Sequence, residues 1–416
     1  MEPVHKSRPT GFDIRPAAPG AAERVNDFIH LSQGLSNSFL LSTADGRIVV
    51  NTGMGFEAAI HKEKYDAVDP GPTRYIILTQ GHVDHVGGVD HFRDPGTDVV
   101  AQANNRAQQA DDARIAGFRA MRSYFAFAHA IDAIARHARG HDRPQPAQSI
   151  PLPTILFDDR LDLEVGGLRL ELLSVPGGET TDSLAIWLPQ HAICFTGNLF
   201  SALFGHFPNL VTIRGDRYRE APRFLESLER VRRLEPEMLL VGHHQPVVGR
   251  ALIQNELLRL RDAVAFVHDK TVEGMNAGVD VRTLMREIVL PPELRVGEGY
   301  GKVAWSVRAI WENYAGWFHH RSTTELYAES PASIAADLVE LAGADAIAER
   351  AAQHLADDQP LRAIHLCEAV RVADPRHARA TEVYIDAHER LLHDSVNFWE
   401  TQWLNHQIRL ARKPSP

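Results

Sequence analysis

A short apolar strand that runs directly into a cluster of histidines and an aspartate constrains this chain more than any other feature. Residues 75–78 predict a buried strand, and Gln80, His82, Asp84 and His85 follow it in close succession. At a strand end, residues i and i+2 face the same way, so Gln80 and His82 address one point. Asp84 and His85 fall where the chain turns into a helix and address a second point nearby. Imidazoles and a carboxylate are ligands that zinc prefers, so the run predicts a metal site; the alternative is a surface loop.

Two later strands end in residues of the same chemistry. Glu179 follows a Pro-Gly-Gly turn at one strand end, and His243 and His244 follow the predicted strand 238–241. Both positions lie where a layered fold gathers its strand-end loops. They favour the metal site over the surface loop.

The order of the predicted elements indicates a layered α/β domain. Short β-rich runs fill residues 27–52, and further strands alternate with predicted helices near 57–65 and 219–234. Such an alternation, with polar clusters at strand ends, predicts a site along one edge of the layers. Beyond residue 252 the chain is almost wholly helical. Residues 344–392 resemble tetratricopeptide-like helical hairpins, which bury their apolar faces by docking or dimerisation.

Charge and composition exclude several classes of partner. The 416-residue chain has a formal charge of −10 and no basic stripe, so nucleic acid is not an expected partner. No stretch approaches the roughly 18 apolar residues of a membrane span, and residues 1–21 lack the apolar core of a signal peptide. The two cysteines, Cys194 and Cys367, fit a reducing compartment. We therefore expect a cytoplasmic protein that acts on a small molecule.

The histidine run is similar to the His-x-His-x-Asp-His motif of the metallo-β-lactamase superfamily, and the later elements resemble its alkyl sulfatase branch. This resemblance implies an αββα sandwich over residues 22–252. It also implies zinc as the cofactor, one or two ions per chain. The implied metal ligands are Gln80, His82, Asp84, His85, Glu179 and His243. Whether His243 or His244 is the last ligand stays open.

The resemblance extends to sulfate binding and to the helical region. Asn209 and Arg214 match an Asn and an Arg, five residues apart, that bind the sulfate group in the alkyl sulfatase branch. The segments around 300–310 and 316–318 look like the alkyl sulfatase dimerisation domain. This likeness implies a helical dimerisation domain over residues 253–408, and thus a homodimer or a hetero-oligomer with a homologous subunit.

Three positions depart from the family pattern. Gln80 replaces a histidine, Asn51 replaces an aspartate that commonly orients a ligand, and Gly197 stands where a bridging glutamate is usual. The neighbouring Asn198 could stand in for that glutamate, but without its charge. The first site of Gln80, His82 and Glu179 is therefore weakened. We expect one tightly held ion at Asp84, His85 and His243, with a second ion weak or absent.

Other side chains are candidates for contacts with substrate. Arg214 has the planar guanidinium that suits an anion, although a surface arginine is the alternative. Tyr124 could contact a leaving group, and His206, just before Asn209, could reach the site. Aromatic residues could line an apolar pocket or belong to the core. They are Phe118, Tyr124, Phe125, Phe127, Phe200, Phe204 and Phe207.

These features predict a metal-dependent hydrolase of a small apolar or aromatic ester or ether, with hydroxide delivered by the metal. A sulfate ester is favoured, and Asp84, Tyr124 and Arg214 are the predicted catalytic residues. The chain ends before the lipid-carrier-like domain of long alkyl sulfatases, which favours a small substrate. An activated aryl ether is the first alternative, and a weakened non-catalytic subunit is the second. A β-lactam or lactone hydrolase would not explain the helical region.

Overall fold

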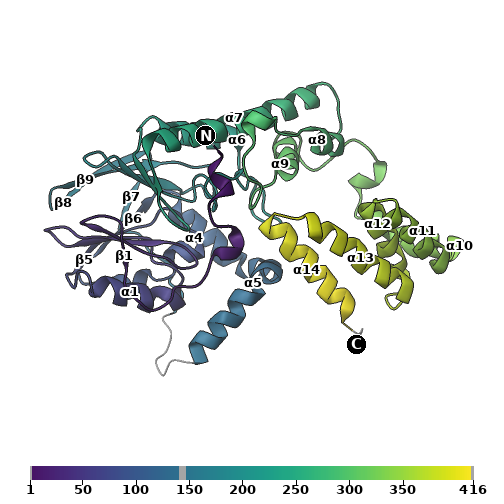
Figure 1. Ribbon diagram of the computed structural model, residues 1–416, viewed down its shortest axis with the longest axis horizontal. Coiled ribbons are helices and arrows are strands. Elements are labelled where there is room, and N and C mark those ends of the chain that lie inside the picture. Colours follow the sequence, from purple (N-terminus) through teal and green to yellow (C-terminus); the bar gives the residue numbers. More distant parts are fainter. Residues whose placement is uncertain (1, 140–146, 414–416) are drawn as a thin grey trace. The chain divides into compact units, whose positions relative to one another are not determined.

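The computed structural model describes residues 2–139 and 147–413 (Figure 1). It divides into two compact units, residues 1–313 and 314–416. The first unit extends past the domain boundary predicted after residue 252, because helices between 250 and 313 pack against one of its sheets. The division into family domains at residues 22–252 and 253–408 stays a prediction.

Two sheets form the centre of the first unit. The first sheet runs in the order β1 Glu23–Arg24, β2 Ile29–Ser32, β3 Ser38–Leu41, β4 Arg47–Val50, β5 Thr73–Ile77, β6 Asp98–Gln102 and β7 Ile155–Phe157. The second runs in the order β13 Val247–Val248, β12 Met238–Val241, β11 Ile193–Gly197, β10 Leu184–Leu188, β9 Leu168–Ser174 and β8 Arg160–Val165. Strands β4 to β7 are parallel, and so are β11 and β12; the other pairs are antiparallel.

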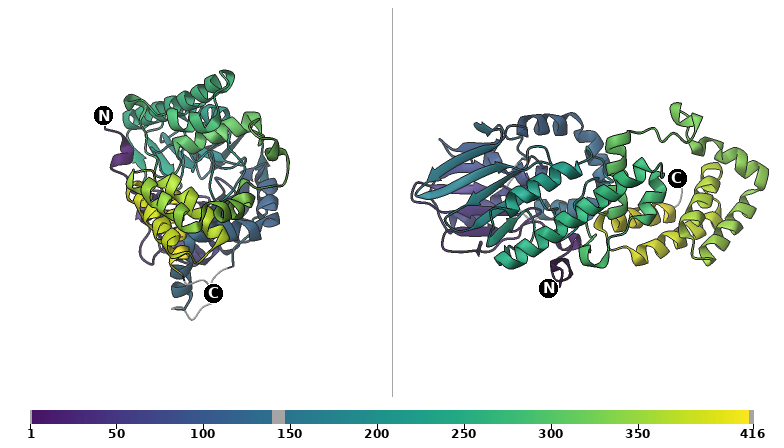
Figure 2. Two further views of the ribbon diagram at one scale, coloured as in Figure 1. Left: turned by 90° about the vertical axis from the view of Figure 1, so that its right-hand side faces the viewer. Right: turned by 90° about the horizontal axis from the view of Figure 1, so that it is seen from above.

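Helices cover the outer faces of both sheets. The first unit contains α1 Ala58–Asp66, α2 Val83–Val86, α3 Val89–Phe92, α4 Asn105–Arg114, α5 Ala116–Arg139, α6 Ala221–Arg232, α7 Arg250–Asn276, α8 Val281–Glu287 and α9 Val303–Ala315. In Figure 1, α1 lies beside the first sheet, and α6 and α7 lie on the far side of the second. Seen from above in Figure 2 (right), the teal strands of the second sheet overlie the purple strands of the first.

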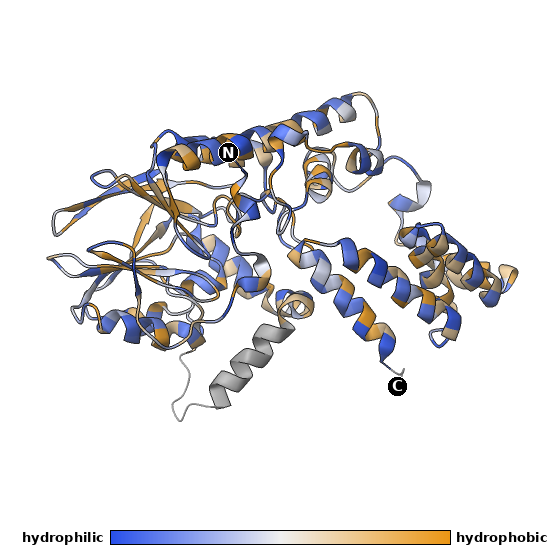
Figure 3. Cartoon of the chain, viewed as in Figure 1, coloured by the Kyte–Doolittle hydropathy of each residue, from blue (hydrophilic) through white to orange (hydrophobic). Residues whose placement is uncertain are grey.

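The central strands β3, β4, β10 and β11 are buried along their whole length, which explains their nearly continuous apolar sequence, whereas the edge strands β1 and β8 carry exposed polar residues. In β4, Ile48 and Val50 point into the core between the sheets, whereas Val49 points to the core beneath α1 and α3. This alternation follows from the two-residue period of a strand. Figure 3 shows hydrophobic residues along the strands. The predicted αββα sandwich is confirmed.

The second unit is helical. It contains α10 Ala335–Ala342, α11 Ala344–Ala356, α12 Pro360–Ala373, α13 Ala378–Asp394 and α14 Phe398–Arg412. Small and apolar side chains fill the space between successive helices, for example Ala351 of α11, Cys367 of α12 and Ala387 of α13. The predicted helical C-terminal region is confirmed. Among the described residues, no helix combines the length and the apolar character that crossing a bilayer requires.

Candidate metal centre

Strand direction brings the predicted polar residues to one edge of the sandwich. In the second sheet, β9, β11 and β12 point the same way, because β10 is antiparallel to both β9 and β11. The loops that follow these three strands carry Glu179, Asn198 and His243. From the first sheet, the loop after β5 carries the histidine run. A site at this edge follows from topology alone.

Asp84, His85 and His243 converge. One ligand atom from each of the three side chains lies within 4.8 Å of the others. The Nε2 atom of His85 is 3.6 Å from the Oδ2 atom of Asp84. Both imidazoles are buried, and the Asp84 side chain is 26% exposed. Two imidazoles and a carboxylate that meet at one point form a suitable binding site for a divalent cation.

The amide of Asn198 completes this group. Its Nδ2 atom lies 3.3 Å from Nε2 of His85 and 3.2 Å from Nε2 of His243. Its Oδ1 atom is buried and has no hydrogen-bond partner within the part of the chain that the structure describes. The Asn198 side chain therefore occupies the space between the two imidazoles.

The protonation state of the imidazoles fits a metal. Burial lowers the pKa of His243 to about 4, and burial also lowers the pKa of His85. Both rings are therefore neutral at pH 7, the form that donates a lone pair to a cation. His244 lies apart: its Nε2 atom is 3.1 Å from the carbonyl oxygen of Thr10. The geometry thus supports His243 and not His244 as the ligand.

The second predicted group, Gln80, His82 and Glu179, is also assembled, but protein partners engage it. The Nε2 atom of Gln80 lies 2.8 Å from Nδ1 of His82, which is itself 3.6 Å from Oε2 of Glu179. The Oε1 atom of Gln80 accepts from the backbone amide of Asn198 at 3.3 Å. These three side chains fit a cation less well than the first group does, because an amide replaces an imidazole.

Arg219 is the main site residue that the sequence analysis missed. Its Nη2 atom lies 2.9 Å from Oε2 of Glu179, and its Nε donates to the Glu179 carbonyl at 2.7 Å. The guanidinium also donates to the carbonyl of Asn209. Burial raises the pKa of the Glu179 carboxyl to about 7, although Arg219 and Arg214 lower it. No pattern distinguishes Arg219 from the arginines around it in the sequence.

The two predicted sulfate-binding residues are linked to this region, Arg214 by its charge and Asn209 by its backbone contact with Arg219. Asn209 is buried, with its Oδ1 atom lacking a partner among the described residues. The charge of Arg214 acts on His82, Glu179 and Tyr300. Burial raises the pKa of Tyr300, and the nearby Glu179 raises it further. Tyr300 enters the sequence analysis only as part of a likeness to a dimerisation domain, so its place beside the site is a finding of the structure.

Two other candidates lie elsewhere in the first unit. Tyr124 is 57% exposed on α5. His206 is buried, and its Nδ1 atom accepts from the backbone amide of Gly299 at 2.9 Å, so it supports the loop that carries Tyr300. Burial lowers the pKa of His206 to about 4. Direct contacts of Tyr124 and His206 with substrate stay predictions.

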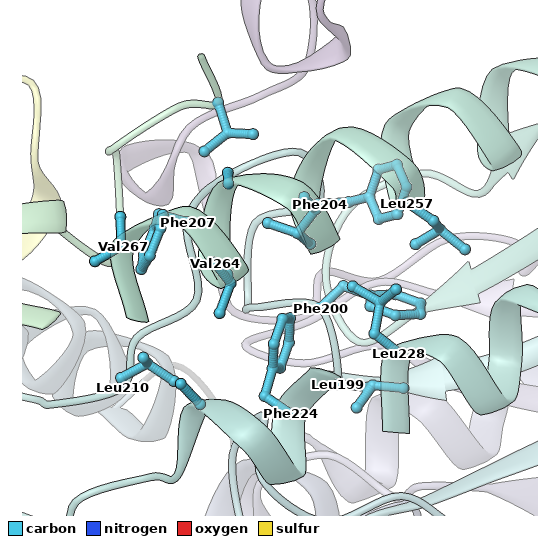
Figure 4. Packing of buried hydrophobic residues seen from close by; sticks show 14 of the residues in the cluster. Leu199, Phe200, Phe204, Phe207, Leu210, Phe224, Leu228, Leu257, Val264 and Val267 are labelled. Atoms are coloured by element: carbon cyan, nitrogen blue, oxygen red, sulfur yellow. The ribbon is translucent and has the colours of Figure 1, made fainter. Parts of the chain in front are cut away.

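Most of the candidate aromatic residues belong to the core. Phe200, Phe204 and Phe207 pack with residues of α6 and α7 in one buried cluster (Figure 4). Phe125 is buried as well, whereas Phe118 is 50% exposed. Phe118 lines a cavity of about 800 Å³ that also borders Glu179 and Arg219. Most other lining residues are polar or charged, so this cavity is not an apolar pocket.

Two family models match the chain. The metallo-beta-lactamase superfamily matches residues 31–243, and the alkyl sulfatase dimerisation family matches residues 281–410. These matches cover the histidine run, the loops with Glu179 and Asn198, and His243.

Curated relatives and solved structures agree with the family models. A linear primary-alkylsulfatase from a Pseudomonas species is 28% identical over 321 residues, which are 73% of this chain and 60% of the relative. The alkyl/aryl-sulfatase BDS1 of Saccharomyces cerevisiae is 24% identical over 92% of this chain and 62% of that protein. The chain thus spans about three fifths of the length of these relatives. The solved structure of the stereoselective inverting sec-alkylsulfatase Pisa1 from a Pseudomonas species superposes with a TM-score of 0.81, at 21% identity, over 94% of this chain and 66% of that one.

Proposed function

The chain belongs to the metallo-beta-lactamase superfamily, and we propose that it is a metal-dependent hydrolase of small sulfate esters. The observation behind the proposal is the convergence of Asp84, His85 and His243 at one edge of the sandwich. The charge of Arg214 acts on the neighbouring His82 and supports an anion site there. The relatives named as alkylsulfatases support sulfate esters as the substrate class. A divalent ion held at this group would supply a water activated at neutral pH.

The protein's own residues have distinct tasks in this proposal. Arg214 binds the sulfate oxygens, because its planar guanidinium matches an oxyanion and its charge already acts on the groups of the site. The side-chain amide of Asn209 donates a hydrogen bond to the same sulfate oxygens. Tyr300 stays protonated at neutral pH, so its hydroxyl can donate a hydrogen bond to the oxygen that leaves. Tyr300 takes the task that the sequence analysis assigned to Tyr124.

The cavity beside Glu179 suggests what kind of alcohol is released. Its walls include Arg119, Asp216 and Gln108, and its aromatic side chains are Phe118 and Tyr218. A long alkyl chain gains little from such walls, because its binding depends on apolar contact. We therefore propose that a short or aromatic alcohol with polar substituents fits better than a detergent-like chain.

The test is release of sulfate from a panel of esters by zinc-loaded protein. The panel contains an aryl sulfate, a long-chain alkyl sulfate and a sulfate ester of a polar alcohol. We expect turnover that fails after chelation and in Arg214→Ala, with the aryl or polar ester preferred. Arg233→Ala is the matched control, because the Arg233 side chain is 75% exposed and does not line the cavity. Hydrolysis that is equally fast in Arg214→Ala would contradict the assigned anion site. Turnover of an aryl ether or a carboxylic ester tested beside the panel, with no sulfate released from the sulfate esters, would favour ether or carboxylic ester chemistry.

A second candidate is a non-catalytic subunit that partners an active homologue. The contacts of Gln80 with His82 and of Arg219 with Glu179 favour it, because they engage part of the weaker group without a metal. Among the described residues, Nε2 of His82 and Oε1 of Glu179 still have no hydrogen-bond partner. This candidate predicts that the protein lacks turnover on the whole panel and raises the activity of a co-purifying homologue.

A further inference from the structure

We propose that Arg122 of α5 is a positioning residue for the anion site, because it fixes the backbone that carries Arg214. Arg119, one helical turn earlier, supports the same loop through Asp216. The inference rests on the proposed function, since it assumes that Arg214 binds the sulfate oxygens. It gives α5 a part in substrate binding that acts through this loop and not through a contact of Arg122 with the substrate.

The loop that carries Arg214 depends on other segments for its position. Residues 209–220 contain no helix or strand. The amide of Gly215 donates to the carbonyl of Thr212 at 2.9 Å, which closes a tight turn with Arg214 inside it. Gly215 has φ +92°, a conformation that favours glycine. Because no sheet or helix holds this turn, side chains that bind its carbonyls decide where it lies.

Arg122 binds the carbonyls of both central residues of the turn. Its Nη2 atom donates to the Ile213 carbonyl at 2.7 Å, and its Nε atom donates to the Arg214 carbonyl at 2.7 Å. One planar guanidinium therefore holds two consecutive peptide groups. The Phe118 ring, with its centroid 5.5 Å from the guanidinium carbon, supports this orientation. A Cβ atom at Gly215 would lie 3.3 Å from Nε of Arg122, so the glycine leaves room for the close approach.

Arg119 holds the far side of the turn. Its Nη2 atom lies 2.9 Å from Oδ1 of Asp216, and its Nη1 atom lies 2.9 Å from Oδ1 of Asp112 in the last turn of α4. The three side chains are only 11% to 19% exposed, so solvent screens this ion-pair network less than it screens a surface pair. Arg119 and Arg122 are three residues apart and therefore face the same side of α5. The backbone of Arg214 thus lies between two anchors of one helix.

A direct attraction between the charge of Arg122 and the anion is the alternative role for this residue. Such an attraction depends on charge alone, so a lysine would preserve it. The hold on two carbonyls depends on the planar, forked shape of the guanidinium, which a lysine lacks. A direct attraction would also persist without the Arg214 side chain, whereas positioning of that side chain would not. The two roles therefore predict different results for Arg122→Lys and for a double variant.

Calorimetric titration of the zinc-loaded protein with sodium sulfate, at constant ionic strength, tests the proposal without relying on turnover. We expect both Arg122→Ala and Arg122→Lys to bind inorganic sulfate about 3- to 10-fold more weakly than wild type. In Arg214→Ala protein, the added Arg122→Ala change should cause no further loss. Arg106→Ala is the matched control and should bind sulfate as wild type does, because Arg106 is an exposed arginine of α4 that donates to the Pro153 carbonyl at 3.4 Å.

The outcomes separate this inference from the proposed function. Wild-type affinity in Arg122→Ala would overturn the inference. Wild-type affinity in Arg122→Lys, or an equal loss from Arg122→Ala with and without the Arg214 side chain, would also overturn it, because either result would make Arg122 a source of charge alone. If Arg214→Ala binds sulfate too weakly to measure, Arg122→Lys decides. A wild-type protein that binds no sulfate, or Arg214→Ala protein that binds it as tightly as wild type, would overturn the anion site of the proposed function and this inference with it.

Discussion

The guanidinium of Arg219 joins two loops of the site, since it contacts both Glu179 and the carbonyl of Asn209. Its side chain is 5% exposed, as is that of Glu179. A buried ion pair of this kind contributes modestly to net stability, but the loss of one partner is costly because the other charge stays buried. Arg219 therefore holds Glu179 in place whether or not a cation binds beside it.

Replacement of Arg219 by methionine is expected to lower the free energy of unfolding by about 3–5 kcal/mol, because Glu179 would be left without its partner. Urea unfolding of the metal-free protein measures this. The double variant Arg219→Met/Glu179→Gln should recover part of the loss. Arg223→Met, at a side chain that is 62% exposed, serves as the control and should change little. A loss below that of the control would contradict the role of Arg219.

His61 gives a prediction about pH. Its ring is buried, and Nδ1 lies 2.7 Å from Oγ of Ser32. Burial lowers the pKa of His61 to about 3, so between that value and its ordinary 6.5 the unfolded chain binds one more proton than the folded one. The stability present above pH 6.5 is therefore lost as pH falls, by up to about 1.4 kcal/mol per pH unit for this residue.

Urea unfolding of wild type and His61→Gln between pH 4 and 6 measures the difference in slope. The variant should lose stability less steeply by up to about 1.4 kcal/mol per pH unit, whatever its absolute stability. If the free energy of unfolding falls with pH at the same rate in both proteins, His61 is protonated in the folded state.

At the scale of single residues, the sequence predicts what is chemically distinctive. The histidines and Asp84 are identifiable because few other tasks need that pattern, and the structure brings them together. Arg219 and Tyr300 are not identifiable from the sequence. Arg219 is one of several arginines in its segment, and Tyr300 lies in the loop before α9, far along the chain from the histidine run. Contacts between distant segments leave no local pattern.

Among the elements, the loop that follows β2 fixes the loop that follows β12. The Nδ2 atom of Asn37 donates to the carbonyls of Val241 and His244 at 2.9 Å and 2.7 Å, and the Asn37 amide donates to the Gly242 carbonyl at 2.7 Å. The two sheets are thus cross-linked at the edge that carries His243. The orientation of that ligand depends on a side chain from the other sheet.

Asn37→Ala is expected to destabilise the protein by about 1–3 kcal/mol for each carbonyl left unpaired, and to weaken metal binding at His243. Denaturant unfolding and metal titration measure the two effects separately. Asn104→Ala is the control, because its Nδ2 bond to the Thr181 carbonyl is exposed. If Asn37→Ala is less stable but binds metal as tightly as wild type, the hydrogen bonds of Asn37 stabilise the fold without orienting His243.

Element prediction succeeded where periodicity was clear. The strand predicted at 238–241 coincides with β12, and the helix predicted near 57–65 is shifted by one residue from α1. Strands β6 and β7 were not predicted, because each is short and lies between helical or Pro-rich segments. Phe200, Phe204 and Phe207 became core residues because α6 and α7 cover them, which only tertiary packing decides.

Across the whole molecule, two family regions and two compact units divide the chain differently. The alkyl sulfatase dimerisation match begins at residue 281, within the first unit, and continues through the second. We propose that the protein is a dimer, as the name of this family suggests. Exposed apolar side chains in the second unit, such as Leu341 at 84% and Trp317 at 68%, are candidates for the interface.

Sedimentation equilibrium at micromolar concentration should give twice the mass of one chain. Leu341→Asp and Trp317→Asp are expected to weaken the association. Arg321→Asp is the control, because it changes the charge at a position that is already polar, and it should leave the association unchanged. A single-chain mass for wild type across the concentration range would contradict the proposed dimer.

If Asp84, His85 and His243 hold one divalent ion, the metal content of the purified protein shows it. Elemental analysis of purified, unchelated protein is compared with that of His85→Ala and His82→Ala. We expect about one ion per chain in wild type, none in His85→Ala and nearly one in His82→Ala. Wild-type protein without metal even after reconstitution, or an ion that His82→Ala loses and His85→Ala keeps, would contradict it.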